Sequence, residues 1–551
     1  MATNSGTRPR PRGNDAGEAR LGAPKPGSLG HEAHATKVTA LAPVGWHAVA
    51  TSDMRSSPST SRLSRAVGLA WAGVRDRRGL VAVLALFMCF GALNVLGIPP
   101  LLPIDERAHV GYALALADGE LPTIDTPLPS SFPPADRDYR NTVWVANHPP
   151  LYYLLAAPFA RVGLAVGGVD SAVELVRWLS LLLGAGALVL VYATALLITR
   201  DDRDVALLST ALAALLPHTL HVSSLAHNDS LATLMAAATL YAALRVAIRG
   251  YSRAGVIALA VTAALAMATR FTSVAVVVPA CGLACVALLL DATVPMQQRI
   301  RRSLAAGALA LGTTLITSGW FYLRNLRLYD DVTGGAALFE KVGRTPRGNA
   351  FGLALQRRLW RQIYEHLWTR FSGGVRLDGV ITEVAWTILF VALLGIGLRA
   401  YARYRRGPIP WTSPTAVGVA GLAATVVLIL AAMFEFYSRG GSLHARYLLP
   451  IAWVPALALA WGLTGLGKTA ARTVVVLVCL LDFLAFSTYL GGLVTEPTAD
   501  AVPLVQALEH NGIRGASWFV AVIVIVVALA LRSVFDGFGS SPEDSRTTRE
   551  A

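Results

Sequence analysis

Charged residues are scarce in this 551-residue chain: Asp, Glu, Lys and Arg make up 15% of it, and hydrophobic residues make up 54%. A soluble domain cannot bury so much apolar surface, so the composition indicates a polytopic membrane protein. Cysteine is scarce too. All four cysteines lie within apolar segments, which is typical of small buried side chains and argues against a disulfide framework or a metal site.

Three motifs that hold nucleotides or zinc are also missing. The chain has no Walker phosphate-binding loop, no Rossmann glycine pattern and no His-Glu-x-x-His sequence. It therefore lacks the usual phosphate cradles, which argues against a sugar carried on a nucleotide as a direct substrate. A short apolar leader with a cleavage site is absent as well, so we expect no signal peptide.

Positive charge is in excess, with a formal net charge of +14. The basic residues stand in short clusters between the apolar segments and do not form one continuous patch. This is the pattern of the positive-inside rule, in which the short cytoplasmic loops of a membrane protein carry its lysines and arginines. The excess charge therefore predicts an orientation in the membrane, and it argues against nucleic acid as a partner.

Apolar segments long enough to cross a bilayer predict an all-α polytopic membrane protein with about twelve transmembrane helices. They lie near 80–98, 175–198, 205–222, 229–248, 254–269, 272–290, 303–323, 383–401, 414–435, 447–466, 472–493 and 517–533. We interpret a further candidate, 149–167, as a juxtamembrane or re-entrant helix of the first outer loop. If it does not cross, every short basic cluster falls on the cytoplasmic side. Its Pro149, Pro150 and Pro158 also favour a broken interfacial helix.

The predicted spans divide the chain into regions of different composition. Both ends are expected in the cytoplasm, and the polar loops are expected outside. The regions are a disordered basic N-terminal region (1–79), a first transmembrane module (80–323) with its first outer loop (99–174), an outer loop with an amphipathic helix near 353–371 (324–382), a C-terminal transmembrane module (383–533) and a cytoplasmic tail (534–551).

Two acidic residues, Asp105 and Glu106, directly follow the first apolar span. An acidic pair costs little where a helix leaves the bilayer, because water reaches it, and far more at mid-membrane. A carboxylate at this interface suits an enzyme that has one substrate in lipid and another in water. The alternative is a pair of ordinary solvated loop acids. His109, one turn further on, either joins such a site or pairs with Glu106.

Other polar side chains stand at the outer ends of the predicted spans. Arg270, Arg324 and Arg446 lie where a lipid phosphate would lie, and arginine can bind a phosphate with two donors at once. The alternative is that they reach toward the interface as isolated charges. His148 either contacts an acceptor or a divalent ion, or begins the interfacial helix. Asp229 begins a span, where capping the helix is the simpler role.

The order of these motifs resembles that of the GT-C superfamily of integral-membrane glycosyltransferases. The motifs are Asp105-Glu106, His-Pro-Pro-Leu-Tyr-Tyr from residue 148, Asn228-Asp229, Gly-Trp-Phe-Tyr-Leu-Arg-Asn from residue 319 and His-Ala-Arg-Tyr-Leu-Leu-Pro from residue 444. Within the superfamily the chain is most similar to bacterial relatives of protein O-mannosyltransferases and lipid A aminoarabinose transferases, over about residues 80–470. One position departs from the pattern: Asn147 stands where some of those relatives have an acidic residue.

The resemblance implies transfer of a sugar from a polyprenyl-phosphate carrier to an extracytoplasmic acceptor, a glycan, lipid or protein of the cell envelope. Asp105 would be the general base that deprotonates the acceptor, and Glu106 would share this role or orient His109. Asp229 would face these acids as a metal ligand, but Asn147 leaves open whether a divalent metal is the cofactor. The protein would then be a multi-pass protein of the plasma membrane, surrounded by its lipids, with an extracytoplasmic active site.

The alternative from a different class is a polytopic lipid or solute transporter, or a flippase, without transferase activity. Such a protein should carry ionisable or Gly/Pro-interrupted helices near the membrane midplane, in two matching halves. Here the charged residues stand at the outer ends of the spans, and the chain shows no convincing internal repeat. The pattern therefore favours the enzyme.

Overall fold

The computed structural model describes residues 77–372, 377, 379–405, 407, 413–493 and 503–538. The predicted disordered N-terminal region up to residue 76, and the predicted tail from residue 539, lie outside the described residues. Helices dominate the described part, where the only strand-like pairing is one isolated bridge between Pro127 and Thr142. The predicted all-α membrane fold is confirmed.

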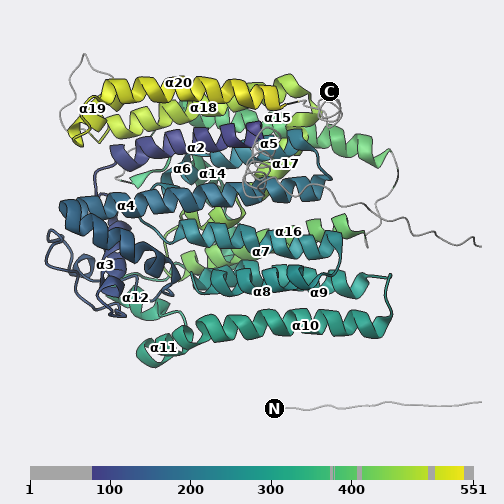
Figure 1. Ribbon diagram of the computed structural model, residues 1–551, viewed down its shortest axis with the longest axis horizontal. Helices are drawn as coiled ribbons and strands as arrows, with labels where there is room; N and C mark the ends of the chain where they lie inside the picture. The colour runs from purple at the N-terminus through teal and green to yellow at the C-terminus, as the bar shows by residue number, and fades with distance from the viewer. Residues whose placement is uncertain are drawn as a thin grey trace, which may run out of the picture. The chain divides into compact units, whose positions relative to one another are not determined.

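In the part of the chain that the structure describes, nine helices are long and apolar enough to cross a membrane. Seven of them are single helices: α2 (Arg78–Gly97), α4 (Leu151–Thr199), α7 (Asp229–Arg249), α15 (Gly379–Tyr404), α16 (Pro414–Ser438), α18 (Lys468–Gly491) and α20 (Ala516–Gly537). The eighth is α9 (Val274–Leu290) with the 3-10 turn before it (Phe271–Ser273). The ninth is the continuous run of α10 (Met296–Thr314), a π-helical turn (Leu315–Gly319) and α11 (Trp320–Tyr329). Figure 1 shows them running side by side.

The remaining predicted spans coincide with helices that are bent or short. One is the pair α5 (Arg203–Ala214) and α6 (Pro217–Ser223), bent by 63°, and another is η5 (Ala445–Ile451) with α17 (Trp453–Gly465), bent by 67°. The third, α8 (Arg253–Met267), has 15 residues and is shorter than the bilayer core, since a helix rises about 1.5 Å per residue. Length and composition therefore support nine to eleven spans among the described residues, and the predicted count of twelve is not confirmed.

Short helices gather at one end of the long ones. Figure 1 shows α3 (Ile104–Ala117), α12 (Gly335–Val342) and α19 (Pro503–His510) at the left. The predicted amphipathic helix is divided into α13 (Ala350–Ala354) and α14 (Arg357–Thr369). α14 packs on α6, α15 and η5 and buries Leu359 and Ile363, so its apolar face contacts the protein itself.

The segment predicted not to cross is the first arm of α4. The helix breaks at Gly167 and Gly168, and Gly168 has a left-handed φ of 75° that favours glycine. The chain folds back at this break, because a Cβ on Gly163 would lie only 2.5 Å from the Cα of Ala172. The arm is therefore one half of a tight helical hairpin. That geometry is compatible with a re-entrant segment, and the position of the arm in the membrane stays a prediction.

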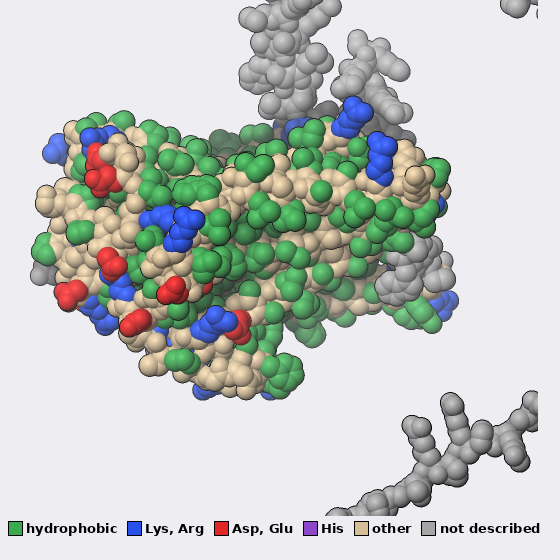
Figure 2. All heavy atoms as spheres, turned by 90° about the horizontal axis from the view of Figure 1, so that it is seen from below, with side chains coloured by type: hydrophobic (Ala, Val, Ile, Leu, Met, Phe, Trp, Pro, Cys, Tyr) green, Lys and Arg blue, Asp and Glu red, His purple; other side chains and the backbone are tan. Residues whose placement is uncertain are grey.

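Charge is unevenly distributed over the molecular surface. On the face shown in Figure 2, hydrophobic side chains dominate the middle, and the visible acidic side chains lie toward the left. At the right only basic side chains accompany the hydrophobic ones. A hydrophobic belt with basic residues at one end is the pattern expected of a membrane protein.

A distinct buried cluster holds the first outer loop against the long helices. It contains Tyr112 of α3 and Tyr152 and Tyr153 of α4, which are all fully buried, together with Ala226 and Leu231 from the turn into α7. The rings of Tyr112 and Tyr153 stack with their centroids 3.8 Å apart. This packing fixes the start of α3, and with it Asp105, against the turn that carries His227.

Candidate active site

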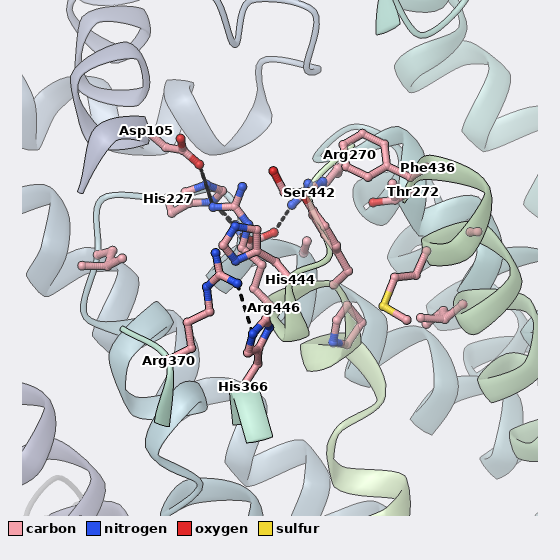
Figure 3. A pocket seen from close by; sticks show the side chains of 18 of the residues that line it. Asp105, His227, Arg270, Thr272, His366, Arg370, Phe436, Ser442, His444 and Arg446 are labelled. Atoms are coloured by element: carbon pink, nitrogen blue, oxygen red, sulfur yellow. Dashed lines mark hydrogen bonds and ion pairs between the residues drawn. The ribbon is translucent and has the colours of Figure 1, made fainter. Parts of the chain in front are cut away.

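A cavity of about 1620 Å³ opens among α3, α7, α9, α14, α16 and η5. Segments far apart in the sequence meet in it, and its polar side chains come from the first outer loop, the turns before α7 and α9, and α14 and η5 with the residues that flank them (Figure 3). Its polar lining includes Asp105, His148, His227, Asp229, Arg270, His366, Arg370, His444 and Arg446. An apolar wall contains Ala232, Ala236, Val276, Ile429, Ala432 and Met433.

Asp105 lies in the first turn of α3, where the helix dipole favours an acidic side chain, and is 22% exposed. Its Oδ2 accepts a hydrogen bond from Nη1 of Arg446 at 2.6 Å and lies 3.4 Å from Nε2 of His227. Burial acts to raise the pKa of Asp105, but Arg446 and His227 outweigh it and hold this pKa well below its ordinary value. The carboxylate is therefore ionised at neutral pH and can accept a proton.

A second carboxylate, Asp229, completes the cluster around His227. Nδ1 of His227 lies 3.1 Å from Oδ2 of Asp229, and Arg270 pairs with Oδ1. Nε of Arg446 is 3.9 Å from Asp229 Oδ2. Burial lowers the pKa of His227 to about 4 despite the hydrogen bond to Asp105, so the ring is neutral at pH 7. Two carboxylates thus balance two guanidinium groups.

Glu106 lines the cavity and is engaged in a buried ion pair. It is fully buried, with Oε1 accepting from Nε of Arg177 and Oε2 accepting from Nη2, each at 2.7 Å. Oε1 also accepts from the backbone N–H of Ala226 at 3.0 Å. Because both oxygens are occupied, these contacts favour a positioning role for Glu106 between α3 and the turn before His227, and its predicted part in catalysis or in orienting His109 stays a prediction.

His109 lies behind the site and does not line the cavity. Its Nδ1 lies 2.9 Å from the hydroxyl of Tyr153, and its ring centroid is 4.0 Å from that of His227. The geometry makes it a support for His227, in place of the predicted contact with substrate or pairing with Glu106. His148 does line the cavity, and the hydroxyl of Tyr112 donates to its backbone carbonyl at 3.2 Å.

The three predicted phosphate-binding arginines divide into two groups. Arg270 and Arg446 line the cavity. Arg324 does not: its Nη2 donates to the carbonyl of Pro122 at 2.7 Å, and its guanidinium lies over the ring of Phe321. Arg324 therefore ties α11 to the first outer loop, and the prediction that it contacts a carrier phosphate is not supported by its position.

The predicted metal site has no support in this geometry. Among the described residues, no group of three or more His, Cys, Asp or Glu side chains is arranged to hold a metal ion. Asp105 and Asp229 both face arginines. Asn147 also lines the cavity, but its Nδ2 donates to the carbonyl of Thr333 at 2.9 Å, which directs the amide toward the start of α12.

Sequence reasoning missed several residues that the fold brings to the site. Arg370, His366 and His444 line the cavity beside Arg446 (Figure 3). The signal for His366 and Arg370 was the polar face of the predicted amphipathic helix, and the signal for His444 was the motif that it shares with Arg446. Arg177 was missed as well, although an arginine within an apolar span is a strong indicator of a buried partner.

Residues 147–320 match the family model of dolichyl-phosphate-mannose-protein mannosyltransferases. The matched segment is less than half of the 551-residue chain, and over that segment the chain is similar to a family of glycosyltransferases. The match begins at Asn147, two residues before the proline pair, and it includes Asp229 and Arg270 of the site. A search of curated proteins finds no match to this chain.

Three solved structures of GT-C proteins are similar to this chain at low identity. With the Saccharomyces cerevisiae Pmt1–Pmt2 complex bound to its sugar donor it shares 20% identity at a TM-score of 0.34, over 46% of this chain and 35% of that one. With ArnT from Cupriavidus metallidurans bound to undecaprenyl phosphate it shares 15% identity at a TM-score of 0.43, over 87% of this chain and 76% of that one. With AglB from Archaeoglobus fulgidus, in complex with an inhibitory peptide and a dolichol-phosphate, it shares 12% identity at a TM-score of 0.35, over 83% of this chain and 55% of that one. The chain thus spans about a third of the yeast chain and about half of AglB.

Proposed function

We propose that this protein is a membrane glycosyltransferase that transfers a sugar from a polyprenyl-phosphate carrier to an extracytoplasmic acceptor, with Asp105 as the general base. The observation that carries the proposal is the environment of Asp105. Its carboxylate is ionised, partly exposed and directed into a large cavity at one end of the membrane helices. A base in that place can meet an acceptor from water and a donor from lipid.

The shape of the cavity supports a lipid-linked donor. A second, mostly apolar hollow of about 700 Å³ lies beside it among α9, α13, α14 and α16. Val274, Ala275, Ala432 and Glu435 line both spaces, so the two adjoin. A polar chamber next to an apolar groove suits a molecule with a charged sugar phosphate at one end and a long hydrocarbon chain at the other.

The chemistry requires only groups that the cavity offers. A hydroxyl or amide of the acceptor attacks the anomeric carbon of the sugar, and its proton passes to Asp105. The bond between the anomeric carbon and the phosphate oxygen breaks, and the electron pair leaves with polyprenyl phosphate. Arginines that face the cavity stabilise the negative charge that grows on this phosphate as the bond breaks.

The rival function is translocation of a lipid or solute without group transfer. The family match to mannosyltransferases favours transfer. An assay in proteoliposomes separates the two, because a transferase forms a glycosylated acceptor and a flippase only moves its substrate between leaflets.

The decisive experiment replaces Asp105 with Asn, which keeps the size of the side chain but cannot accept the proton. Proteoliposomes receive a panel of polyprenyl-phosphate sugars and a cell-envelope extract as acceptor. We expect transfer to fall by roughly 10²–10⁴-fold, the usual contribution of a general base, while donor binding persists. Asp118→Asn is the matched control, because Asp118 follows the same helix, is exposed and pairs with Arg161. Near-normal transfer by Asp105→Asn would refute Asp105 as the base.

A further inference from the structure

Two arginines extend into the same part of the cavity from different elements. Arg370 is the residue directly after α14, and Arg446 lies in η5. Figure 3 shows their side chains converging, with the ring of His444 beside them. Burial, and after it the repulsion from Arg446, lowers the pKa of Arg370. Such an arrangement is stable only when something between the arginines compensates the charge.

The described carboxylates do not supply that compensation for Arg370. Arg446 is shared between Asp105 and Asp229, whereas Arg370 makes no ion pair within the described residues. Nη1 of Arg370 lies 3.1 Å from Nε2 of His366, which is a neutral partner. Burial and then Arg370 lower the pKa of His366 to about 4. Among the residues that the structure describes, the positive charge of Arg370 therefore faces the cavity without a paired anion.

Arg446 also has an unused donor at this place. Its Nη1 bonds Asp105, but its Nε is buried and has no hydrogen-bond partner. The carboxylate oxygen Oδ2 of Asp229 lies 3.9 Å from this Nε, beyond hydrogen-bond distance, so Asp105 and Asp229 do not saturate the donors of Arg446. Around the same space, burial and then Arg446 lower the pKa of His444 to about 2, and His444 adds no further charge at neutral pH.

We propose that Arg370 and Arg446 together form the subsite for the phosphate of the lipid-linked donor. The inference rests on the proposed function and names the residues that recognise the carrier. Both guanidinium groups present N–H donors to one small space, which is the arrangement that binds a phosphate with several charge-assisted bonds. Arg370 is the essential addition, because it brings the positive charge that Asp105 and Asp229 leave uncompensated.

The charges of the site support this assignment through the whole reaction. Before transfer, Asp105, Asp229, Arg270, Arg370 and Arg446 carry a net charge of one positive unit, and the phosphodiester of the donor carries one negative unit. During transfer the proton moves to Asp105, while the departing phosphate gains a second negative charge. Neutralising Asp105 frees the charge of Arg446 for the phosphate at that moment. The charge of these five groups therefore matches that of the donor phosphate before and after the step.

Lipid binding to the full-length protein in nanodiscs tests the subsite. The probes are undecaprenyl phosphate and undecaprenol, which share the same hydrocarbon chain and differ only in the phosphate. We expect Arg370→Ala to lower the affinity for undecaprenyl phosphate by about 10- to 100-fold, the effect of losing charge-assisted hydrogen bonds, and to leave undecaprenol binding unchanged. Arg370→Lys should recover part of the loss, because it keeps the charge but not the two-donor geometry.

A matched control comes from the same helix. Arg358 is exposed and does not line the cavity, so Arg358→Ala should bind both lipids as the unmodified protein does. Equal binding of undecaprenyl phosphate by Arg370→Ala and the unmodified protein would overturn the subsite and leave the transferase proposal standing. Failure of the unmodified protein to prefer undecaprenyl phosphate over undecaprenol would instead overturn the polyprenyl-phosphate carrier itself, and the subsite with it.

Discussion

Arg177 of α4 and Glu106 of α3 form an ion pair in which both side chains are completely buried. Arg177 uses Nε and Nη2 for the two carboxylate oxygens, and its guanidinium also donates to the carbonyls of Val95, Ile98 and Pro99 at the end of α2. One side chain thus joins α2, α3 and α4. The residue before Glu106 is the proposed base, so the position of Asp105 depends on this pair.

Replacing either member of this pair should destabilise the protein strongly. Glu106→Gln leaves a buried guanidinium without its counter-charge, and breaking a buried pair costs about 3–5 kcal/mol. Arg177→Met should cost more, because it strands both the carboxylate and the three carbonyls. Thermal unfolding in detergent measures both. Arg161→Met is the control: it removes an exposed pair with Asp118 and should cost at most about 1 kcal/mol. If Arg177→Met unfolded at the same temperature as this control, the pair would have no structural role.

Arg446 and Arg324 should behave differently when each is replaced by alanine. Arg446→Ala should weaken undecaprenyl phosphate binding by at least about 10-fold, because it removes a charge-assisted donor from the cavity. Arg324→Ala should leave lipid affinity unchanged and lower only the unfolding temperature, since it loses the bond to Pro122. Lipid titration and thermal unfolding of the same two preparations separate these effects. A comparable loss of lipid affinity in both variants would show that Arg324 does reach the carrier.

The stability of the protein should fall as the pH is lowered from about 6.5 to about 4. Burial is the main cause that lowers the pKa of His227 and His366 to about 4, so in this window the unfolded state binds protons that the folded state does not. Asp105 acts at lower pH. Its folded pKa is depressed, so its stabilisation is complete above the unfolded pKa of about 3.9 and is lost only as the pH falls toward the folded value.

Thermal unfolding between pH 4 and 8 measures this dependence. His227→Gln should reduce the slope between pH 6.5 and 4, because it removes one of the groups that titrate only on unfolding. Asp105→Asn should leave the slope in that window nearly unchanged. A stability that stayed constant from pH 8 to pH 4 would contradict the burial of neutral histidines at the site.

The predicted orientation can be tested with single cysteines in a background that lacks the four native ones. Glu120 and Ala254 are both exposed in the structure, and the orientation from the basic clusters puts Glu120 outside and Ala254 in the cytoplasm. A membrane-impermeant thiol reagent added to intact cells should modify Glu120→Cys and spare Ala254→Cys. The reverse pattern would invert the orientation and place the cavity in the cytoplasm.

The helices and the importance of Asp105 were accessible from the sequence. Hydropathy locates membrane helices because the bilayer imposes a minimum apolar length, and each predicted span coincides with a helix or a bent pair. The breaks were harder to predict. The bend between η5 and α17 follows an apolar run that contains Pro450. Mean hydropathy over such a run carries no information about a change in the direction of the helix axis.

The partners within the site could not be predicted, because they depend on the direction in which each helix faces. Arg324 follows a π-helical turn, Leu315–Gly319, and one extra residue in a turn rotates all later side chains by about 100°. Glu106 and Arg177 are separated by 71 positions, and neither residue indicates the other locally. The amphipathic pattern near 353–371 does not say which surface covers its apolar face, and Arg370 lines the cavity because α14 packs that face on the protein itself.

The folded-back arm of α4 also sets how far the site lies from its surroundings. Tyr153 on the inner face of the arm is fully buried and contacts His109, which backs His227. The next residue, Leu154, is 54% exposed on the opposite face. A residue that supports the site and a residue that meets the environment are thus neighbours in the chain. On this side a single helix separates the proposed catalytic centre from the molecules around the protein.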